Sequence, residues 1–169
     1  MMKHIIYILL LFFLVSCGDD VIREPHSLAY DSTSFNALAN KIIKQNSIFE
    51  MDDLKRHYKK INKVNVRYSN GNDAGDTACA DLYTVIDSLK IDKALVFDLK
   101  RDLEKTTLRE FYKSNDSILF RVDGLLGTSW GFFYSKRPLN NTTSFTFTDF
   151  LIENIERVNA HWKKVAIHP

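Results

Sequence analysis

The sequence has few of the residues that cross-link a protein chain or interrupt its helices and strands. Its 169 residues include two cysteines, three prolines and six glycines. Two cysteines allow at most one disulfide, which excludes the dense disulfide framework of many small secreted domains. The fold must therefore be stabilised mainly by burial of apolar side chains, which make up 45% of the sequence.

The sequence also lacks a dominant charge of one sign. It carries 23 Lys and Arg side chains against 21 Asp and Glu, a formal net charge of +2. Proteins that bind nucleic acid through its phosphates usually show a clear basic excess. We therefore expect no nucleic-acid partner.

The apolar run at the start of the chain is too short for a lasting membrane span. Residues 5–15 are apolar and follow Lys3, whereas a helix needs about 20 residues to cross the hydrocarbon core. This length is typical of the apolar region of a signal peptide, and Ser16 supplies the small residue beside the cleavage site. Residues 1–16 are therefore predicted to be a signal peptide.

The segment Leu14-Val15-Ser16-Cys17 resembles the bacterial lipobox, with leucine three residues before the cysteine. The resemblance implies cleavage before Cys17, diacylation of its sulfur, and usually a third chain, such as palmitate, on the new amino group. Each buried methylene contributes about 0.8 kcal/mol, so two or three chains anchor a protein firmly. The alternative is an ordinary secretory signal with a chance cysteine. No cofactor is expected beyond the covalent lipid.

Residues 17–33 are polar and predict a flexible tether. Gly18 departs from the aspartate that retains proteobacterial lipoproteins in the inner membrane. Asp19 and Asp20 resemble the short acidic export signal of small Bacteroidota lipoproteins. These resemblances imply a lipid-anchored protein of the cell envelope, in the outer rather than the inner membrane, facing the periplasm or the cell surface.

Residues 34–169 predict a single α+β domain. Apolar residues at helical spacing indicate helices, and alternating patterns later in the chain indicate strands. We expect N-terminal helices packed on one face of a C-terminal antiparallel sheet. The expected helices are 34–43, 52–62, 77–89, 92–105 and 149–157, and the expected strands are 64–68, 108–112, 118–122, 130–134 and 161–167.

One motif carries a catalytic possibility. Residues 127–131 (GTSWG) match the G-x-S-x-G nucleophile elbow, and Asp149 and His161 follow in the hydrolase order. The chemistry would need Ser129 on a strained turn between a strand and a helix. An aromatic, strand-like segment follows instead, so the glycines read as turn residues of a hairpin. A small serine hydrolase that uses Ser129, His161 and Asp149 is kept as the alternative function.

A second motif has the spacing of a calcium loop. Its candidate oxygen ligands are Asn70, Asn72, Asp76 and Asp81. Calcium needs six to eight oxygen ligands, and this segment lacks several of the usual charged ones. We favour an ordinary loop in which Asp76 caps the helix predicted at 77–89, and we expect no metal ion.

A basic cluster lies at helical spacing in the predicted helix 52–62 and just beyond it. It could bind a partner, although such a run is often only the solvated face of a helix. Its members are Lys55, Arg56, Lys59, Lys60 and Lys63.

The absence of a convergent catalytic set favours a non-enzymatic binding or interaction module. Its partner would be an envelope protein, or a toxin if the protein is an immunity-type inhibitor. The alternatives are the serine hydrolase and a structural or small-ligand-binding lipoprotein. Phe133 is predicted on the strand face opposite Trp130, where it could belong to an exposed binding patch.

Overall fold

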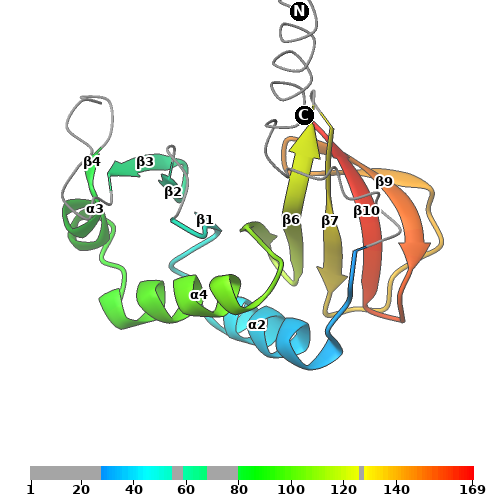
Figure 1. The fold of residues 1–169 in the computed structure, drawn as a ribbon, viewed down its shortest axis with the longest axis horizontal. Coiled ribbons are helices and arrows are strands. Elements are labelled where there is room, and N and C mark those ends of the chain that lie inside the picture. The colour runs from blue at the N-terminus through cyan, green and yellow to red at the C-terminus, as the bar shows by residue number, and fades with distance from the viewer. Residues whose placement is uncertain (1–27, 55–58, 68–79, 126–127) are drawn as a thin grey trace, which may run out of the picture.

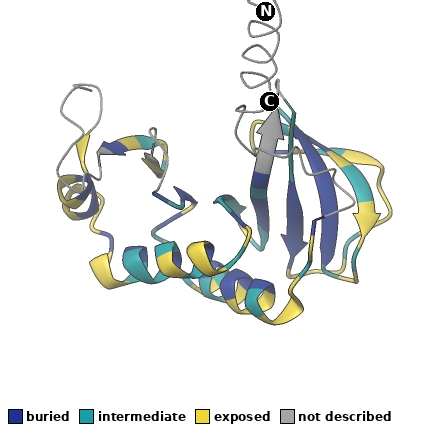
Figure 2. Ribbon diagram, in the orientation of Figure 1, coloured by how far each residue is buried: buried dark blue, intermediate teal, exposed yellow. Residues whose placement is uncertain are grey.

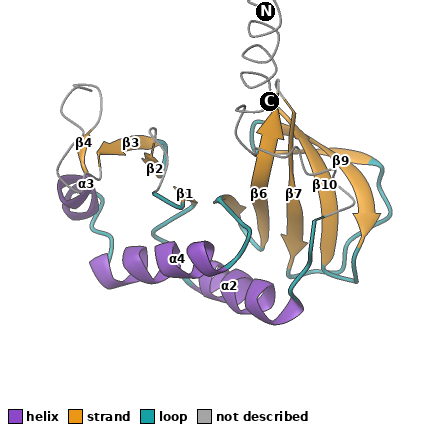
Figure 3. Cartoon of the chain, viewed as in Figure 1, coloured by secondary structure: helices purple, strands orange, loops and turns teal. Residues whose placement is uncertain are grey.

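The computed structural model describes residues 28–54, 59–67, 80–125 and 128–169. Within these ranges the chain forms three helices and ten strands (Figures 1 and 3), which confirms the α+β class. The helices are α2 (Ser32–Lys44), α3 (Leu82–Ser88) and α4 (Lys93–Lys105). The strands are β1 (Glu50–Asp52), β2 (Lys59–Ile61), β3 (Val64–Arg67), β4 (Ala80–Asp81), β5 (Glu110–Ser114), β6 (Ser117–Leu125), β7 (Thr128–Ser135), β8 (Ser144–Phe147), β9 (Phe150–Arg157) and β10 (Trp162–His168).

All ten strands belong to one sheet in the order β4-β3-β2-β1-β5-β6-β7-β10-β9-β8. Neighbouring strands are antiparallel except β3 and β4, which are parallel. The sheet therefore includes four short strands from the N-terminal half in addition to the strands expected at the C-terminal end. Figure 1 shows β6, β7, β10 and β9 following one another from left to right. The sheet curls, because Tyr112 on β5 contacts Phe150 on β9 although three strands lie between them in the sheet.

The two long helices form where local sequence signals agree. The side chain of Asp31 accepts hydrogen bonds from the backbone N–H groups of Thr33 and Ser34 at the start of α2, so Asp31 is the N-cap. Asp92 caps α4 in the same way. The two helices contact each other, with an ion pair between Lys41 and Asp102, and both bury an apolar stripe against the sheet.

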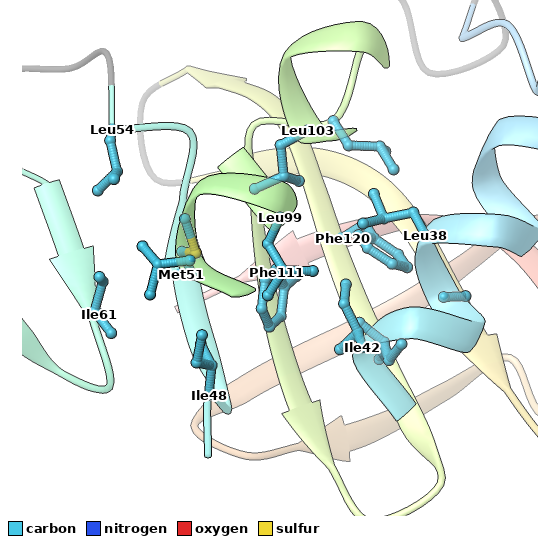
Figure 4. Close-up of a cluster of buried hydrophobic side chains, with 14 of the residues drawn as sticks. Leu38, Ile42, Ile48, Met51, Leu54, Ile61, Leu99, Leu103, Phe111 and Phe120 are labelled. Atoms are coloured by element: carbon cyan, nitrogen blue, oxygen red, sulfur yellow. The ribbon is translucent and has the colours of Figure 1, made fainter. Parts of the chain in front are cut away.

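The sheet separates two apolar cores. Strand β6 shows the division, because Ile118 and Phe120 face the helices whereas Leu119 faces the opposite side. The helix-side core is the larger one, and Figure 4 shows its residues from α2, α4 and the strands pointing toward one another. The other core lies on the concave face of the sheet and consists of Leu119, Phe133, Phe147, Ile152, Val165 and Ile167. Figure 2 shows the buried residues concentrated along β7 and β10.

The helix predicted at 52–62 is wrong, because Asp52 belongs to β1 and residues 59–61 form β2. Residues 55–58 lie outside the described part of the chain. The side chain of Asp52 accepts hydrogen bonds from the backbone N–H groups of Leu54 and Lys60, at 2.8 and 3.0 Å. These bonds fold the chain back on itself, and Leu54 has a φ of 55°, which no α-helix can accommodate. The sequence showed the spacing of a helix but not this side-chain contact.

The helix predicted at 149–157 is also wrong, because Phe150–Arg157 forms strand β9. Its apolar residues fit a helical period, but β9 pairs with both β8 and β10. Tertiary pairing overrides the local preference here. The helix predicted at 77–89 starts only at Leu82, since Ala80 and Asp81 pair with β3; residues 77–79 lie outside the described part.

Candidate functional site

The candidate catalytic residues are not brought together. Ser129 lies within strand β7, between Gly124 on β6 and Ile167 on β10, and no helix follows it. Nδ1 of His161 lies 2.9 Å from the backbone oxygen of Ser135 at the other end of β7. The six intervening steps along a strand correspond to about 20 Å. Asp149 lies in the β8–β9 turn and pairs with Lys63, so these three residues do not share a site.

Gly131 of the same motif has a packing role. A Cβ atom at this position would lie 1.8 Å from the backbone oxygen of Phe120 on the neighbouring strand. Only glycine permits this close approach of β6 and β7, next to the register shift after Arg121. The second glycine of the motif is thus explained by the sheet, and Gly127 lies outside the described residues.

The calcium-loop residues Asn70, Asn72 and Asp76 lie in the segment 68–79, outside the described residues. Asp81 is described, and its carboxylate accepts hydrogen bonds from the N–H groups of Tyr83 and Thr84 at the start of α3. In the described ranges, no three or more His, Cys, Asp and Glu side chains are placed to hold a metal ion. No helix among the described residues is long and apolar enough to cross a membrane. Cys17 and Cys79 are also outside these ranges.

Phe133 does not belong to an exposed patch, because it is only 5% exposed and packs in the concave-face core. Its ring makes edge contacts with those of Phe145 and Phe147, at centroid distances of 4.8 and 5.1 Å. The curling of the sheet brings β8 over Phe133. The alternation of residues along β7 could not predict that another strand covers this side chain.

Part of the basic cluster lines a hollow. Lys60 lies on β2, and Lys63 lies in the tight turn between β2 and β3, where both Asn62 and Lys63 have positive φ. Lys55, Arg56 and the side chain of Lys59 fall outside the described part of the chain. The cluster thus supplies two side chains to the hollow, from a hairpin instead of a helix.

This hollow, here named the strand-end recess, lies where β1, β5 and the β2–β3 turn meet the β8–β9 turn. Its volume is about 500 Å³, within the range of about 300–1,000 Å³ that is usual for small-molecule sites. It is lined by Phe49, Glu50, Lys60, Lys63, Tyr112, Lys113, Ser114, Thr148, Asp149 and Phe150.

A smaller cavity of about 80 Å³ shares Glu50, Lys60 and Tyr112 with the recess. We call it the inner pocket. It lies between β1, β2, β5 and β6, on the face of the sheet opposite the helices. Its remaining lining residues are Met51, Asp52, Glu110 and Arg121.

Charged side chains in the inner pocket form a hydrogen-bonded group around Glu110. The hydroxyl of Tyr112 donates to the Glu110 carboxylate, and an Arg121 guanidinium nitrogen lies 3.1 Å from the same oxygen. Burial, and then the negative charge of Glu110, raise the pKa of Tyr112. Nε of Arg121 is buried and has no hydrogen-bond partner among the described residues.

Burial also shifts the two acids of β1. It raises the pKa of Asp52 to about 7. The hydrogen bonds that the carboxylate accepts from two backbone N–H groups lower the pKa, but burial has the larger effect. It raises the pKa of Glu50 as well, which the nearby Lys60 opposes. Both side chains are nearly inaccessible to solvent. Perturbed carboxyl groups of this kind gather at functional sites more often than elsewhere.

The ammonium groups around the recess already have partners. Nζ of Lys63 lies 3.7 Å from a carboxylate oxygen of Asp149, and Lys60 lies close enough to Glu50 to lower its pKa. Lys113 donates to the backbone oxygens of Ile43 and Gln45 at the end of α2. The recess therefore has two lysine–carboxylate combinations, Lys63 with Asp149 and Lys60 with Glu50, and the third ammonium group is bound at the helix end.

Aromatic rings form the rest of the recess wall. Tyr112 and Phe150 meet edge to face, with centroids 4.8 Å apart, although their strands are not neighbours in the sheet. Phe49 is 44% exposed and lines the recess. The recess thus offers ring surface next to paired charges.

Sequence reasoning did not find most of this site. Glu50, Asp52 and Glu110 alternate with apolar residues, as they would in a strand with one solvated face. The curl of the sheet turns that face inward, and this depends on contacts between distant strands. Comparisons with protein-family models, with curated proteins and with solved structures found no match to the chain.

Proposed function

We propose that this protein is a lipid-anchored lipoprotein of the bacterial envelope whose α+β domain is a non-enzymatic binding module. The strand-end recess is its ligand site, and Cys17 carries the lipid. The observation that carries the proposal is a cavity of about 500 Å³ that combines aromatic rings with paired charges. Binding is favoured over serine hydrolysis because Ser129 and His161 lie at opposite ends of β7.

The anchor is tested by metabolic labelling with a palmitate analogue. The wild-type protein is expected to incorporate the label and to sediment with membranes, because acyl chains on residue 17 hold it there. Cys17→Ser is expected to lose both properties, whereas Cys79→Ser, the matched control, keeps them. An unlabelled wild-type protein, or label retained in Cys17→Ser, would contradict the anchor.

The ligand site is tested separately by nuclear magnetic resonance. The lipidated protein in detergent micelles is titrated with a library of small polar and aromatic fragments. We expect shifts of backbone resonances to cluster at Phe49, Glu50 and Phe150, whereas Tyr83 on α3 stays unchanged. A library that perturbs only residues away from the recess, or none at all, would refute the recess as a ligand site.

A further inference from the structure

We infer that the strand-end recess binds a short, uncharged oligosaccharide. This inference rests on the proposed binding function and assigns a chemical class to the ligand. It is carried by three features of the recess, namely exposed ring surface, adjacent hydrogen-bond donors and acceptors, and charged groups that already have partners.

The aromatic rings fit one side of a sugar. A pyranose ring presents C–H groups on one face, and burying this apolar face against an aromatic ring is favourable. Phe49 leaves 44% of its surface accessible, and Phe150 stands with Tyr112 across the recess. The rings are therefore placed at the wall of the cavity and not only in its supporting core.

The polar groups fit the hydroxyls of a sugar. A hydroxyl both donates and accepts hydrogen bonds, and two adjacent hydroxyls can bridge a donor and an acceptor that lie close together. Lys63 and Asp149 form such a pair, with 3.7 Å between nitrogen and oxygen. Glu50 and Lys60 provide another combination of acceptor and donor, deeper in the recess.

The partners of the charged groups disfavour an ionised ligand. An anion would compete with Asp149 for Lys63, and with the helix-end carbonyl groups for Lys113. A cation would have to displace Lys63 from Asp149 or Lys60 from Glu50. A neutral ligand needs no rearrangement of these pairs, and it leaves no buried charge unpaired.

The inference is tested by isothermal titration calorimetry on the lipidated protein in detergent. The neutral probes are cellotetraose, maltotetraose, mannotetraose and chitotetraose, and the charged probes are tetragalacturonate and the fully deacetylated chitosan tetramer. At least one neutral probe is expected to bind, and at least tenfold more tightly than either charged probe. Phe49→Ala is expected to raise its Kd about tenfold. Tyr83→Ala is the control, because Tyr83 is an equally exposed ring, 45% accessible, on α3.

Binding of none of the four neutral probes would overturn the inference, as would tighter binding of a charged probe. Equal affinities of Phe49→Ala and Tyr83→Ala would also overturn it, because the ring would then play no part. The fragment titration separates the two proposals. Fragments that perturb the recess while every saccharide fails would leave the binding function standing and reject the sugar.

Discussion

Asp52 shows how one buried side chain can fix the local path of the chain and also lower the stability of the fold when it ionises. Its carboxylate holds the backbone N–H groups of Leu54 and Lys60, so it ends β1 and positions β2. Yet burial raises its pKa from the ordinary 3.8 to about 7. The protonated form is thus favoured by folding, and ionisation of Asp52 works against the folded state.

The sign of the resulting pH dependence follows from these two pKa values. A carboxyl group with a higher pKa in the folded state contributes its full stabilisation below about pH 4, and this contribution is lost as the pH rises through about 7. Between pH 4.5 and pH 8 the free energy of unfolding should fall by on the order of 2 kcal/mol because of Asp52. Urea denaturation at the two pH values measures this change.

Asp52→Asn should flatten that pH dependence, since an amide does not ionise. It should also lower stability at both pH values, because an amide has one acceptor oxygen for two N–H groups. Asp98→Asn on the exposed face of α4 is the control and should keep the wild-type pH dependence. An unchanged dependence in Asp52→Asn would show that Asp52 does not titrate in this range.

At the scale of single elements, α2 depends on a residue far along the chain. Lys113 on β5 reaches the backbone oxygens of Ile43 and Gln45, where α2 ends. A cation at this end of a helix is favoured by the helix dipole and satisfies carbonyl groups that the helix itself leaves free. Burial lowers the pKa of Lys113, but these contacts supply its hydrogen bonds.

Lys113→Met should therefore destabilise the protein by about 1–2 kcal/mol, through the unpaired carbonyl groups and the lost charge. Arg101→Met is the control, because Arg101 pairs with Asp98 on an exposed helix surface and should contribute less than about 0.5 kcal/mol. Thermal unfolding followed by circular dichroism compares the two. Equal losses of stability in both variants would argue against the role of Lys113 at the helix end.

The elements that could be predicted from the sequence are those with local signals. The helix α4 has its cap at Asp92 and its apolar stripe within one segment, and the β6–β7 hairpin alternates within another. Strand β9 and the β1–β2 region were misread because their form depends on partners elsewhere in the chain. The recess was missed for the same reason, since Glu50, Tyr112 and Phe150 meet only after the sheet has curled.

At the scale of the whole molecule, the curled sheet is held by contacts between strands that are not neighbours. Tyr112 on β5 touches Phe150 on β9, and β6, β7 and β10 lie between these two strands in the sheet. Lys63 in the β2–β3 turn and Asp149 in the β8–β9 turn form a second contact across the curl, at the surface. The ring contact is buried more deeply than the ion pair and should contribute more to holding the curl.

A double-mutant cycle tests this ranking. Tyr112→Leu and Phe150→Leu should show a coupling energy of about 1 kcal/mol in urea denaturation, because each single change already removes the ring contact. Lys63→Met and Asp149→Asn should couple by less than about 0.5 kcal/mol, since these side chains are 73% and 84% exposed. A larger coupling for the ion pair than for the rings would reverse the ranking.

The position of β10 has a consequence for how this protein is made. β10 follows the β8–β9 hairpin in the chain but lies between that hairpin and β7 in the sheet. The hairpin consequently has no place to dock until residues 162–168 have been synthesised. A chain that stops before these residues lacks a strand from the interior of the sheet and not an edge strand. Its β8–β9 hairpin then has no strand that connects it to β7.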